Sequence, residues 1–280
     1  MLTNLNEVLK YAQQHKCAIG AFNTPTLEAI RAIIDNAEEL NVPVIISHAE
    51  CHEKEAPLDI IGPIMLFMAK KAKVPVCVHL DHGEHVNYIE RALELGFTSV
   101  MYDGSTLSYK ENVKNTKIVV SLARKYNASV EAEIGALASR EGGDNNGGAV
   151  YTEPDEAVKF VKDTNIDALA CSFGTAHGIY KSKPKLDFER IKTIRELINI
   201  PLVMHGGSGL PSEDYIKAME CGVEKINYYS YMGRAGVSSA LEAIQSKNYT
   251  FYHEIAYQAY LGMKEDSLKA MNVFYKNKYN

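Results

Sequence analysis

The sequence lacks the features that mark several specialised classes of protein. Its five cysteines are odd in number and form no C-x-x-C pair, so neither a disulfide framework nor a thiolate zinc knuckle is indicated. The longest apolar run, residues 60–69, contains Gly62 and Pro63 and is too short to span a bilayer. The start of the chain has no uninterrupted apolar core of the kind that a secretory signal needs. We therefore expect a cytoplasmic protein that has no membrane partner.

Concentrated positive charge is also absent. Lysine and arginine total 30 against 35 aspartate and glutamate residues, which gives a formal net charge of −5 without any basic block. Proteins that bind the nucleic-acid backbone regardless of sequence need a concentrated basic face, so we expect no nucleic-acid partner. With 46% hydrophobic and 23% charged residues, the composition is typical of a globular protein with a large core.

Short apolar, β-branched segments alternate along the chain with segments of helical period. Short apolar runs of this kind are typical of strands that are buried on both faces. The predicted strands cover residues 18–23, 43–47, 75–80, 99–103, 129–134, 168–172, 201–205 and 224–227. Eight strand–helix units fit an α/β chain that folds as a (β/α)8 TIM barrel better than an open doubly wound sheet. We expect one domain over residues 1–280, with extra C-terminal helices from about residue 248 to residue 280.

Polar residues stand at the carboxyl ends of these predicted strands, where a TIM barrel carries its active site. Three histidines, His82, His177 and His205, lie at or just beyond such ends. Three imidazoles that converge and leave a fourth position open are typical of a catalytic zinc site. A single histidine at a strand end is more often structural, so this prediction depends on the barrel.

Carboxylates accompany the three histidines at the same predicted edge. Asp81 precedes His82, and the two side chains would point to opposite faces unless the strand has begun to turn. Asp81 would either orient a neighbouring imidazole or transfer a proton. Asp103 and Glu133 would serve either as further oxygen ligands or in an ion pair across the barrel mouth.

Glycine-rich sequence follows the seventh predicted strand. Gly206, Gly207 and Ser208 come directly after it, and residues 227–230 follow the eighth strand. Backbone N–H groups in such loops bind anions, and the loops after strands seven and eight are the recurrent phosphate site of TIM barrels. The sequence therefore predicts a phosphorylated substrate, with Lys181 either reaching the same phosphate or lying in solvent.

Six segments together resemble the motifs of the class II, metal-dependent ketose-bisphosphate aldolases. They are HLDHG (79–83), GFTSVMYDGS (96–105), VEAEIG (130–135), HGIYK (177–181), HGGSG (205–209) and KIN (225–227), in the order that the family has them. The resemblance extends from Gly20 to about residue 230. This family includes fructose-bisphosphate and tagatose-bisphosphate aldolases and enzymes that act on other ketose phosphates.

The resemblance assigns roles to individual residues. It implies that His82, His177 and His205 hold a catalytic Zn²⁺ and that Asp103 and Glu133 hold a second or displaced divalent ion; a monovalent cation is a further expected cofactor. Asp81 matches the catalytic aspartate, and Glu141 matches the catalytic glutamate of a loop. The residues that would contact dihydroxyacetone phosphate or shape its pocket are Asn23, Gly178, Lys181, Gly206, Gly207, Ser208, Asn227, Tyr228, Tyr229 and Ser230. A homodimer or homotetramer is usual among such enzymes.

The implied activity is that of an aldehyde-lyase in carbohydrate metabolism. A ketose phosphate, by family default fructose or tagatose 1,6-bisphosphate, would be cleaved reversibly to dihydroxyacetone phosphate and an aldehyde. Asp81 would take the C4 hydroxyl proton, and Glu141 would exchange the proton on the enediolate carbon. Two alternatives stay open: a zinc hydrolase on the same fold, and a phosphosugar-binding barrel without turnover.

Departures from the family pattern concern the substrate rather than the chemistry. Ala49 and Glu50 stand where the family has a small hydroxyl residue near the aldehyde, and an acidic residue would repel a second phosphate. The last arginine is Arg234, so the late arginine that holds a distal phosphate in the family has no counterpart. We therefore expect an aldehyde that lacks the terminal phosphate.

Overall fold

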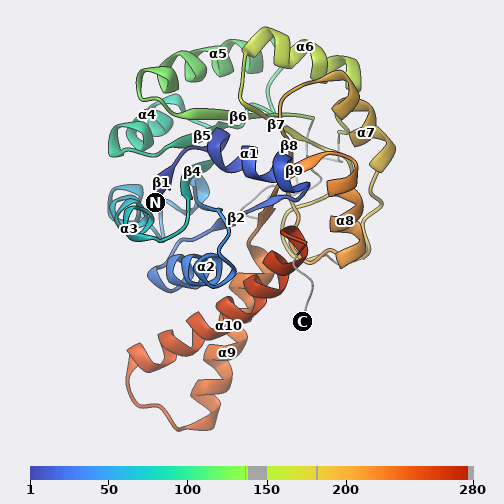
Figure 1. Ribbon diagram of the computed structural model, residues 1–280. Coiled ribbons are helices and arrows are strands. Elements are labelled where there is room, and N and C mark those ends of the chain that lie inside the picture. Colours follow the sequence, from blue (N-terminus) through green and yellow to red (C-terminus); the bar gives the residue numbers. More distant parts are fainter. Residues whose placement is uncertain (136, 138–149, 181, 277–280) are drawn as a thin grey trace.

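Eight parallel strands close into a barrel in the computed structural model, which describes residues 1–135, 137, 150–180 and 182–276 (Figure 1). The barrel strands are β2 (Ile19–Asn23), β3 (Val44–Ala49), β4 (Val76–Gly83), β5 (Ser99–Tyr102), β6 (Ser129–Ile134), β7 (Ala168–Cys171), β8 (Leu202–Met204) and β9 (Val223–Tyr228). Each strand pairs in parallel with its neighbours in chain order, β2 pairs with β9, and β4 pairs with β5. The predicted TIM barrel and all eight of its strands are confirmed.

Helices connect the strands on the outside of the barrel. They are α2 (Leu27–Leu40), α3 (Leu58–Lys71), α4 (Val86–Leu95), α5 (Tyr109–Lys125), α6 (Pro154–Thr164), α7 (Phe188–Leu197) and α8 (Ser212–Glu220), with a short 3₁₀ helix η1 (Glu50–His52) after β3. Local sequence sets their ends. The Thr26 hydroxyl accepts the Ala29 N–H at the start of α2, and Gly96 ends α4 with a φ of +106° that only glycine adopts readily.

Two elements precede the barrel and were not predicted. Strand β1 (Leu2–Thr3) pairs with the first residues of β4, and helix α1 (Leu5–His15) follows it. Helix α1 contacts β2, β3, β4, β6 and β9, so it crosses the end of the barrel at which the strands begin (Figure 1). The amino-terminal end is thereby covered, and the carboxyl ends of the strands are left for a binding site.

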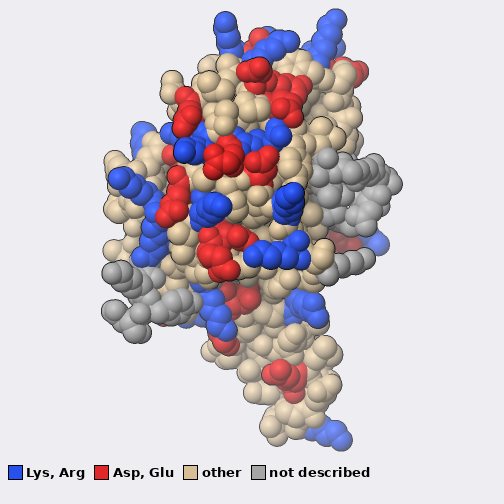
Figure 2. All heavy atoms as spheres, turned by 90° about the vertical axis from the view of Figure 1, so that its right-hand side faces the viewer, with Lys and Arg blue, Asp and Glu red and all other residues tan. Residues whose placement is uncertain are grey.

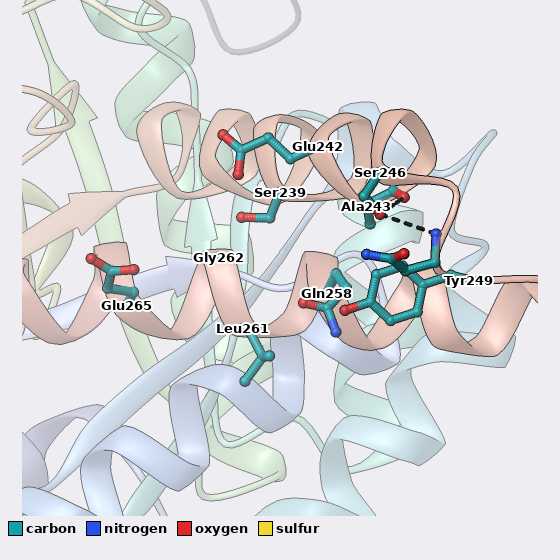
Figure 3. A pocket seen from close by; sticks show the side chains of 10 residues that line it. Ser239, Glu242, Ala243, Ser246, Tyr249, Gln258, Leu261, Gly262 and Glu265 are labelled. Atoms are coloured by element: carbon teal, nitrogen blue, oxygen red, sulfur yellow. Dashed lines mark hydrogen bonds between the residues drawn. The ribbon is translucent and has the colours of Figure 1, made fainter.

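A helical hairpin ends the described chain. Helix α9 (Ser230–Ser246) begins directly after β9, and α10 (Tyr252–Phe274) packs against α9, α2 and α8. The expected extension from about residue 248 corresponds to α10, while α9 is the eighth barrel helix, lengthened until it projects beyond the barrel (Figure 1). Figure 3 shows a hollow between the two helices, with Ser239 and Glu242 on one side and Gln258 on the other. Within the described residues, the helices are too short or too polar to act as membrane spans.

Charge is distributed differently over the barrel and the hairpin. On the face seen in Figure 2, basic and acidic side chains are interspersed over the barrel, and few charges lie at the projecting end of the molecule. Several exposed apolar side chains lie close together on the hairpin, among them Val237, Leu241, Ile244, Phe251 and Tyr252, which is 85% exposed. The hairpin thus combines exposed apolar side chains with few charges.

Candidate active site

A bulge at the end of β4 brings Asp81 and His82 to the same side. The register with β5 shifts between Leu80 and Gly83, and His82 has a φ of +46°, in the left-handed region that non-glycine residues seldom adopt. The strand has therefore begun to turn at His82, so the side chains of Asp81 and His82 need not point to opposite faces. Such local strain costs on the order of 1–3 kcal/mol and is typical of functional sites.

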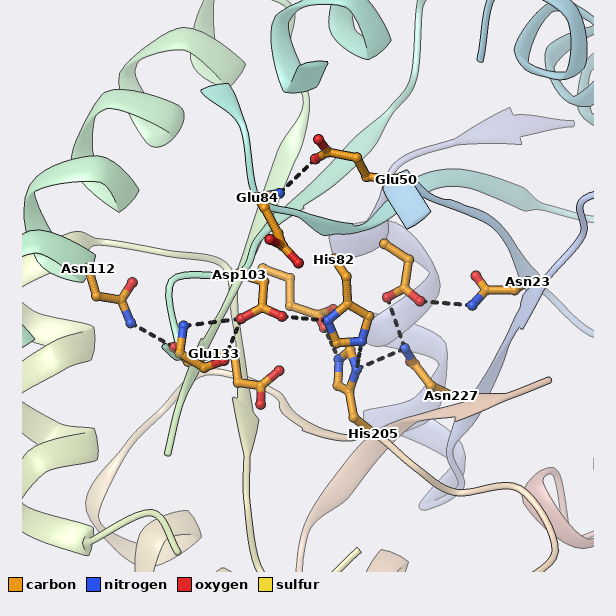
Figure 4. A network of polar contacts seen from close by, with 12 residues as sticks. Asn23, Glu50, His82, Glu84, Asp103, Asn112, Glu133, His205 and Asn227 are labelled. Carbon is orange, nitrogen blue, oxygen red and sulfur yellow. Dashed lines mark hydrogen bonds and ion pairs between the residues drawn. The ribbon is translucent and has the colours of Figure 1, made fainter. Parts of the chain in front are cut away.

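The three predicted histidines meet at this end of the barrel. The imidazole of His82 lies 4.6 Å from that of His205 and 4.8 Å from that of His177, measured between ring centroids. One ring nitrogen from each of the three lies within 4.8 Å of the others. The fold thus brings together three histidines that the sequence predicts as a cluster, two of which, His82 and His205, are labelled in Figure 4.

Carboxylates fix which nitrogens of two histidines face each other. His82 Nδ1 lies 2.7 Å from Asp103 Oδ2, and His205 Nε2 lies 2.8 Å from Glu131 Oε1. A carboxylate accepts the N–H of each ring, so His82 Nε2 and His205 Nδ1 are the nitrogens that face each other. These two atoms are 2.9 Å apart and share one proton in a hydrogen bond, a proton that a metal ion would replace. Imidazoles whose outer nitrogens are each held by a carboxylate are typical of the histidine ligands of a metal in proteins.

Two charged residues that sequence reasoning missed lie beneath this cluster. Glu131 and Lys225 are both fully buried inside the barrel, with 2.8 Å between Oε2 and Nζ. His79 lies below as well, where its Nδ1 is 2.8 Å from Ser99 Oγ, and burial lowers its pKa to about 3. Burial alone would raise the pKa of Glu131, but Lys225 and His205 outweigh it and lower that pKa to about 2. Glu131 is therefore an ionised orienting group for His205.

A second group of ligand atoms adjoins the first. His82, Asp103 and Glu133 bring one ligand atom each within 4.8 Å of one another. Asp103 also accepts hydrogen bonds from the backbone N–H and the hydroxyl of Ser105. Glu133 Oε2 is buried without a hydrogen-bond partner among the described residues, and burial, followed by the charge of Asp103, raises the pKa of Glu133. An unpartnered buried carboxylate oxygen beside two other ligand atoms suits a cation.

Asp81 is fully buried and held by two amides. Asn23 Nδ2 donates to Asp81 Oδ2 at 3.1 Å, and Asn227 Nδ2 donates to Asp81 Oδ1 at 3.0 Å. The carboxylates that orient imidazoles are Asp103 and Glu131, so Asp81 remains available for proton transfer. Burial alone would raise the pKa of Asp81, but His82, His205 and Lys225 outweigh it and hold that pKa well below its usual range.

Glycines allow a close approach of three loops beside this carboxylate. Gly206 has a φ of +62°, and a Cβ there would lie 2.5 Å from the carbonyl oxygen of Ala176. A Cβ on Gly207 would lie 2.7 Å from the Ile226 side chain, whereas one on Gly178 would meet open space. The pocket that results is lined by Asn23, His177, Gly178, Gly206, Ser208, Asn227, Tyr228, Tyr229 and Ser230. These residues were predicted as a metal ligand and as substrate contacts, and the fold brings them to one cavity.

Two tyrosines that follow one another in the chain point in different directions. The hydroxyl of Tyr228 donates to Asp266 on α10 at 3.0 Å, so its side chain reaches away from the barrel interior although the residue borders the pocket. Tyr229 lies between β9 and α9. Its backbone N–H donates to Ser208 Oγ at 2.7 Å, and this hydrogen bond connects the segments that follow β8 and β9. Tyr180, which was not predicted, also holds the loop after β8, because its hydroxyl donates to the Gly206 carbonyl. Glu141 and Lys181 lie outside the described residues.

Comparisons with known proteins give the family of the chain. A family model described as class-II fructose-bisphosphate aldolase matches residues 3–278. A 6-phospho-5-dehydro-2-deoxy-D-gluconate aldolase from Halalkalibacterium halodurans is 41% identical over 234 residues, which cover 81% of this chain and 79% of the relative.

Solved structures give the same result for the fold. The crystal structure of the YdjI aldolase from Escherichia coli K12 is 32% identical, superposes with a TM-score of 0.87 and matches 98% of this chain and 97% of that one. A fructose-bisphosphate aldolase from Campylobacter jejuni, with a TM-score of 0.81 over 98% of this chain and 95% of the other, is only 22% identical and supports the fold alone. The chain belongs to the class-II fructose-bisphosphate aldolase family and is an aldolase, a carbon–carbon lyase.

Proposed function

We propose that the chain catalyses the zinc-dependent, reversible cleavage of a ketose phosphate to dihydroxyacetone phosphate and an aldehyde. One observation carries the proposal: a cluster of three imidazoles adjoins an amide-held Asp81 and a glycine-lined pocket at the same end of the barrel. The cluster suits a metal, the aspartate suits proton transfer, and the pocket suits a phosphate. A class II aldolase needs these three parts next to one another.

His82, His177 and His205 are the residues that would hold the zinc ion. Neutral imidazoles are common zinc ligands, and a set of three leaves a position for substrate. When bound there, Zn²⁺ acts as a Lewis acid that polarises the ketone and adjacent hydroxyl oxygens of the substrate. Asp103 and Glu133, with His82, are the candidates for a second or displaced divalent ion. A monovalent cation remains an expectation from the sequence.

Asp81 is the proposed acid–base group for the hydroxyl on C4. In cleavage its carboxylate takes the proton of that hydroxyl while the C3–C4 bond breaks, and in condensation it returns the proton to the aldehyde oxygen. Asn23 and Asn227 each donate to one carboxylate oxygen and so fix its orientation. Glu141, which the family resemblance assigns, would move the proton on the enediolate carbon.

The phosphate of dihydroxyacetone phosphate is proposed to bind where the loops after β7, β8 and β9 meet. Gly178, Gly206, Ser208 and Ser230 border that pocket, where backbone N–H groups can approach an anion. Gly207 lies between two of these residues, and Lys181, outside the described residues, is the cation that the resemblance assigns to the same phosphate.

We further propose that the substrate carries a single phosphate. Glu50 stands where the family has a small hydroxyl residue near the aldehyde and would repel a second phosphate, and no arginine follows Arg234 to bind one. The name of the H. halodurans relative specifies a sugar acid with one phosphate, which also supports a ketose monophosphate.

Proton exchange into dihydroxyacetone phosphate tests the proposal without knowledge of the aldehyde. We expect zinc-loaded protein to exchange the C–H proton in deuterated water and chelated protein to lose this exchange until zinc is restored. Borohydride with substrate should leave activity intact, because no lysine Schiff base forms. A well-folded, zinc-loaded protein without exchange would contradict the proposal and favour a binding barrel that lacks turnover.

Assembly into a homodimer or homotetramer is proposed through the hairpin of α9 and α10. Exposed apolar side chains there, such as Leu241 at 51% and Ile244 at 59%, are of the kind that partner subunits cover. A cytoplasmic location and the lack of a nucleic-acid partner stay predictions from the sequence.

A further inference from the structure

A short segment after β3 lies beside the lining of the pocket. In the barrel, β2 lies between β3 and β9, so the loops that follow β3 and β9 meet above the end of β2. His52, the last residue of η1, and Tyr229, directly after β9, make this contact, with 5.2 Å between their ring centroids. Asn23, which holds Asp81, is the last residue of β2. His52 therefore lies next to a residue that borders the pocket.

His52 offers a hydrogen-bonding atom that the protein does not use. Its Nδ1 is buried and has no hydrogen-bond partner among the described residues. The acidic neighbours are engaged elsewhere. Glu50 accepts the backbone N–H of Glu84 and pairs with the His85 ring, and Glu53 accepts from Tyr88 and from the Leu58 N–H. A buried polar atom without a partner costs about 1–3 kcal/mol, so a ligand that pairs with it gains affinity.

The charge around His52 favours an uncharged ligand group. Glu50, Glu53 and Glu55 precede or follow it within three residues, and Asp81 lies close enough to act on it electrostatically. Burial lowers the pKa of His52, against the opposing effects of Asp81 and Glu55, so the ring is neutral at pH 7. A neutral imidazole exchanges single hydrogen bonds with a hydroxyl group, whereas a phosphate dianion is bound by several charge-assisted donors.

We infer that His52 binds a hydroxyl group of the aldehyde substrate and, with Tyr229 beside it, makes the enzyme select an uncharged hydroxyaldehyde over a phosphorylated one. This inference rests on the proposed aldolase function and names the chemistry of its second substrate. Dihydroxyacetone phosphate would lie in the glycine-lined pocket, and the aldehyde would lie beside it, between Asp81 and His52. His52 is thus a specificity-determining residue and takes no part in bond breaking.

Aldol addition with three-carbon aldehydes tests the inference. Glyceraldehyde, propanal, glyceraldehyde 3-phosphate and 3-oxopropanoate present hydroxyls, no polar group, a phosphate and a carboxylate, respectively. For the parent enzyme we expect the highest kcat/KM with glyceraldehyde. The His52→Ala variant should lose about tenfold or more of that value, since one lost hydrogen bond of about 1.5 kcal/mol corresponds to about a tenfold change. Its kcat/KM with propanal should stay unchanged.

Two further variants keep the test decisive. In His52→Asn, the amide can replace Nδ1, so we expect partial recovery for glyceraldehyde. His253→Ala removes an exposed histidine of α10, far along the chain from the site, and should match the parent enzyme with every aldehyde. Circular dichroism and thermal melting report whether His52→Ala folds; if it does not, the Asn variant carries the comparison.

Proton exchange into dihydroxyacetone phosphate separates this inference from the proposed function. Absence of exchange in the parent enzyme would overturn the proposed function. With exchange present, an equal loss of glyceraldehyde and propanal activity in His52→Ala would overturn the role of His52 in recognising a hydroxyl. A parent enzyme that prefers glyceraldehyde 3-phosphate or 3-oxopropanoate to glyceraldehyde would overturn selection of an uncharged aldehyde.

Discussion

The mouth of the barrel and the hairpin of α9 and α10 depart from ordinary protein surfaces in opposite ways. At the mouth, titratable groups such as Asp81, Glu133 and His205 are almost completely buried, with at most 3% of each exposed. On the hairpin, apolar side chains are exposed, including Phe251 at 62%. Buried charge and exposed apolar surface both cost free energy, and each cost is recovered when a partner binds.

The difference shows what kind of partner each region suits. Buried carboxylates and imidazoles pair with cations, phosphates and hydroxyl groups, so the mouth suits a metal and a small polar substrate. Exposed aliphatic and aromatic side chains pair with another apolar surface, so the hairpin suits a protein. Changes at the mouth should therefore alter chemistry and metal affinity, and changes on the hairpin should alter assembly alone.

The largest effect on catalysis is expected from Asp81→Asn. The amide has nearly the same shape but cannot take the C4 hydroxyl proton, so kcat for aldol cleavage should fall about 10²–10⁴-fold, the usual contribution of a general base. Zinc content, measured by metal analysis, should not change, because Asp81 is not among the grouped ligand atoms.

Proton exchange provides the control for Asp81→Asn. Exchange of the dihydroxyacetone phosphate C–H proton depends on the other proposed base, Glu141, and should persist in this variant. If cleavage and exchange fell by the same factor, Asp81 would act on binding or on the enediolate proton rather than on the C4 hydroxyl.

A smaller effect is expected from Glu131→Gln, which acts through His205. The amide can still accept the His205 N–H, but it carries no charge, and buried Lys225 loses its counter-ion. We expect zinc affinity, measured by competition with a chelator, to fall about 10–100-fold. The visible spectrum of the cobalt-substituted enzyme should also change.

Glu224→Gln is the matched control for Glu131→Gln, because Glu224 directly precedes Lys225 on β9. Glu224 faces the opposite side of β9 from Lys225, where it accepts from Gln13 and lies 3.7 Å from Arg195. This variant should keep the zinc affinity of the parent enzyme. An equal loss of affinity in the two variants would point to a general effect on folding.

The sequence predicts the barrel because its strands have a distinct composition. Short β-branched runs, such as residues 43–47, are buried on both faces and stand out from the amphipathic helices. Helix α1 was missed although Leu5, Val8, Leu9 and Ala12 have helical spacing and are buried, because the start of the chain was considered only as a signal peptide. A repeated unit is easier to find than an element that occurs once.

The buried charged pair of Glu131 and Lys225, below the strand ends, was not predicted. Inward positions alternate, so Glu131 lies one layer below Glu133, Lys225 below Asn227, and His79 below Asp81. The same alternation would have predicted that Tyr228 faces outward, since Asn227 faces inward. No sequence pattern could give the pairing of His52 with Tyr229, because it depends on loops that follow different strands.

His48, a buried histidine outside the metal cluster, should affect stability rather than chemistry. His48 on β3 is fully buried, with 2.8 Å between its Nε2 and the Tyr88 hydroxyl, and burial lowers its pKa to about 4. The unfolded chain, with a histidine pKa near 6.5, binds this proton more readily, so stability should fall as the pH drops from about 6.5 to about 4. The loss should be about 3 kcal/mol.

Urea unfolding at pH 7 and at pH 4.5 measures this dependence in the zinc-free protein. In His48→Gln, the amide keeps the contact with Tyr88 but does not titrate, so the pH dependence should be weaker by most of that amount. Identical pH dependence in the two proteins would contradict the assignment of the dependence to His48.

The smallest effect on activity, and the largest on assembly, is expected from a change on the hairpin. Leu241→Glu combined with Ile244→Glu places two charges on the exposed apolar face of α9, where a partner subunit would have to bury them. Sedimentation should show a smaller particle than the parent protein, with kcat/KM for cleavage within about twofold, because the double substitution lies outside the pocket. Ile60→Glu on α3, where the parent side chain is 64% exposed, supplies the control and should leave the mass unchanged. If both variants kept the parent mass, the hairpin would not hold the subunits together. If the hairpin variant formed a smaller particle and also lost activity, the mouth and the hairpin would be coupled rather than separate.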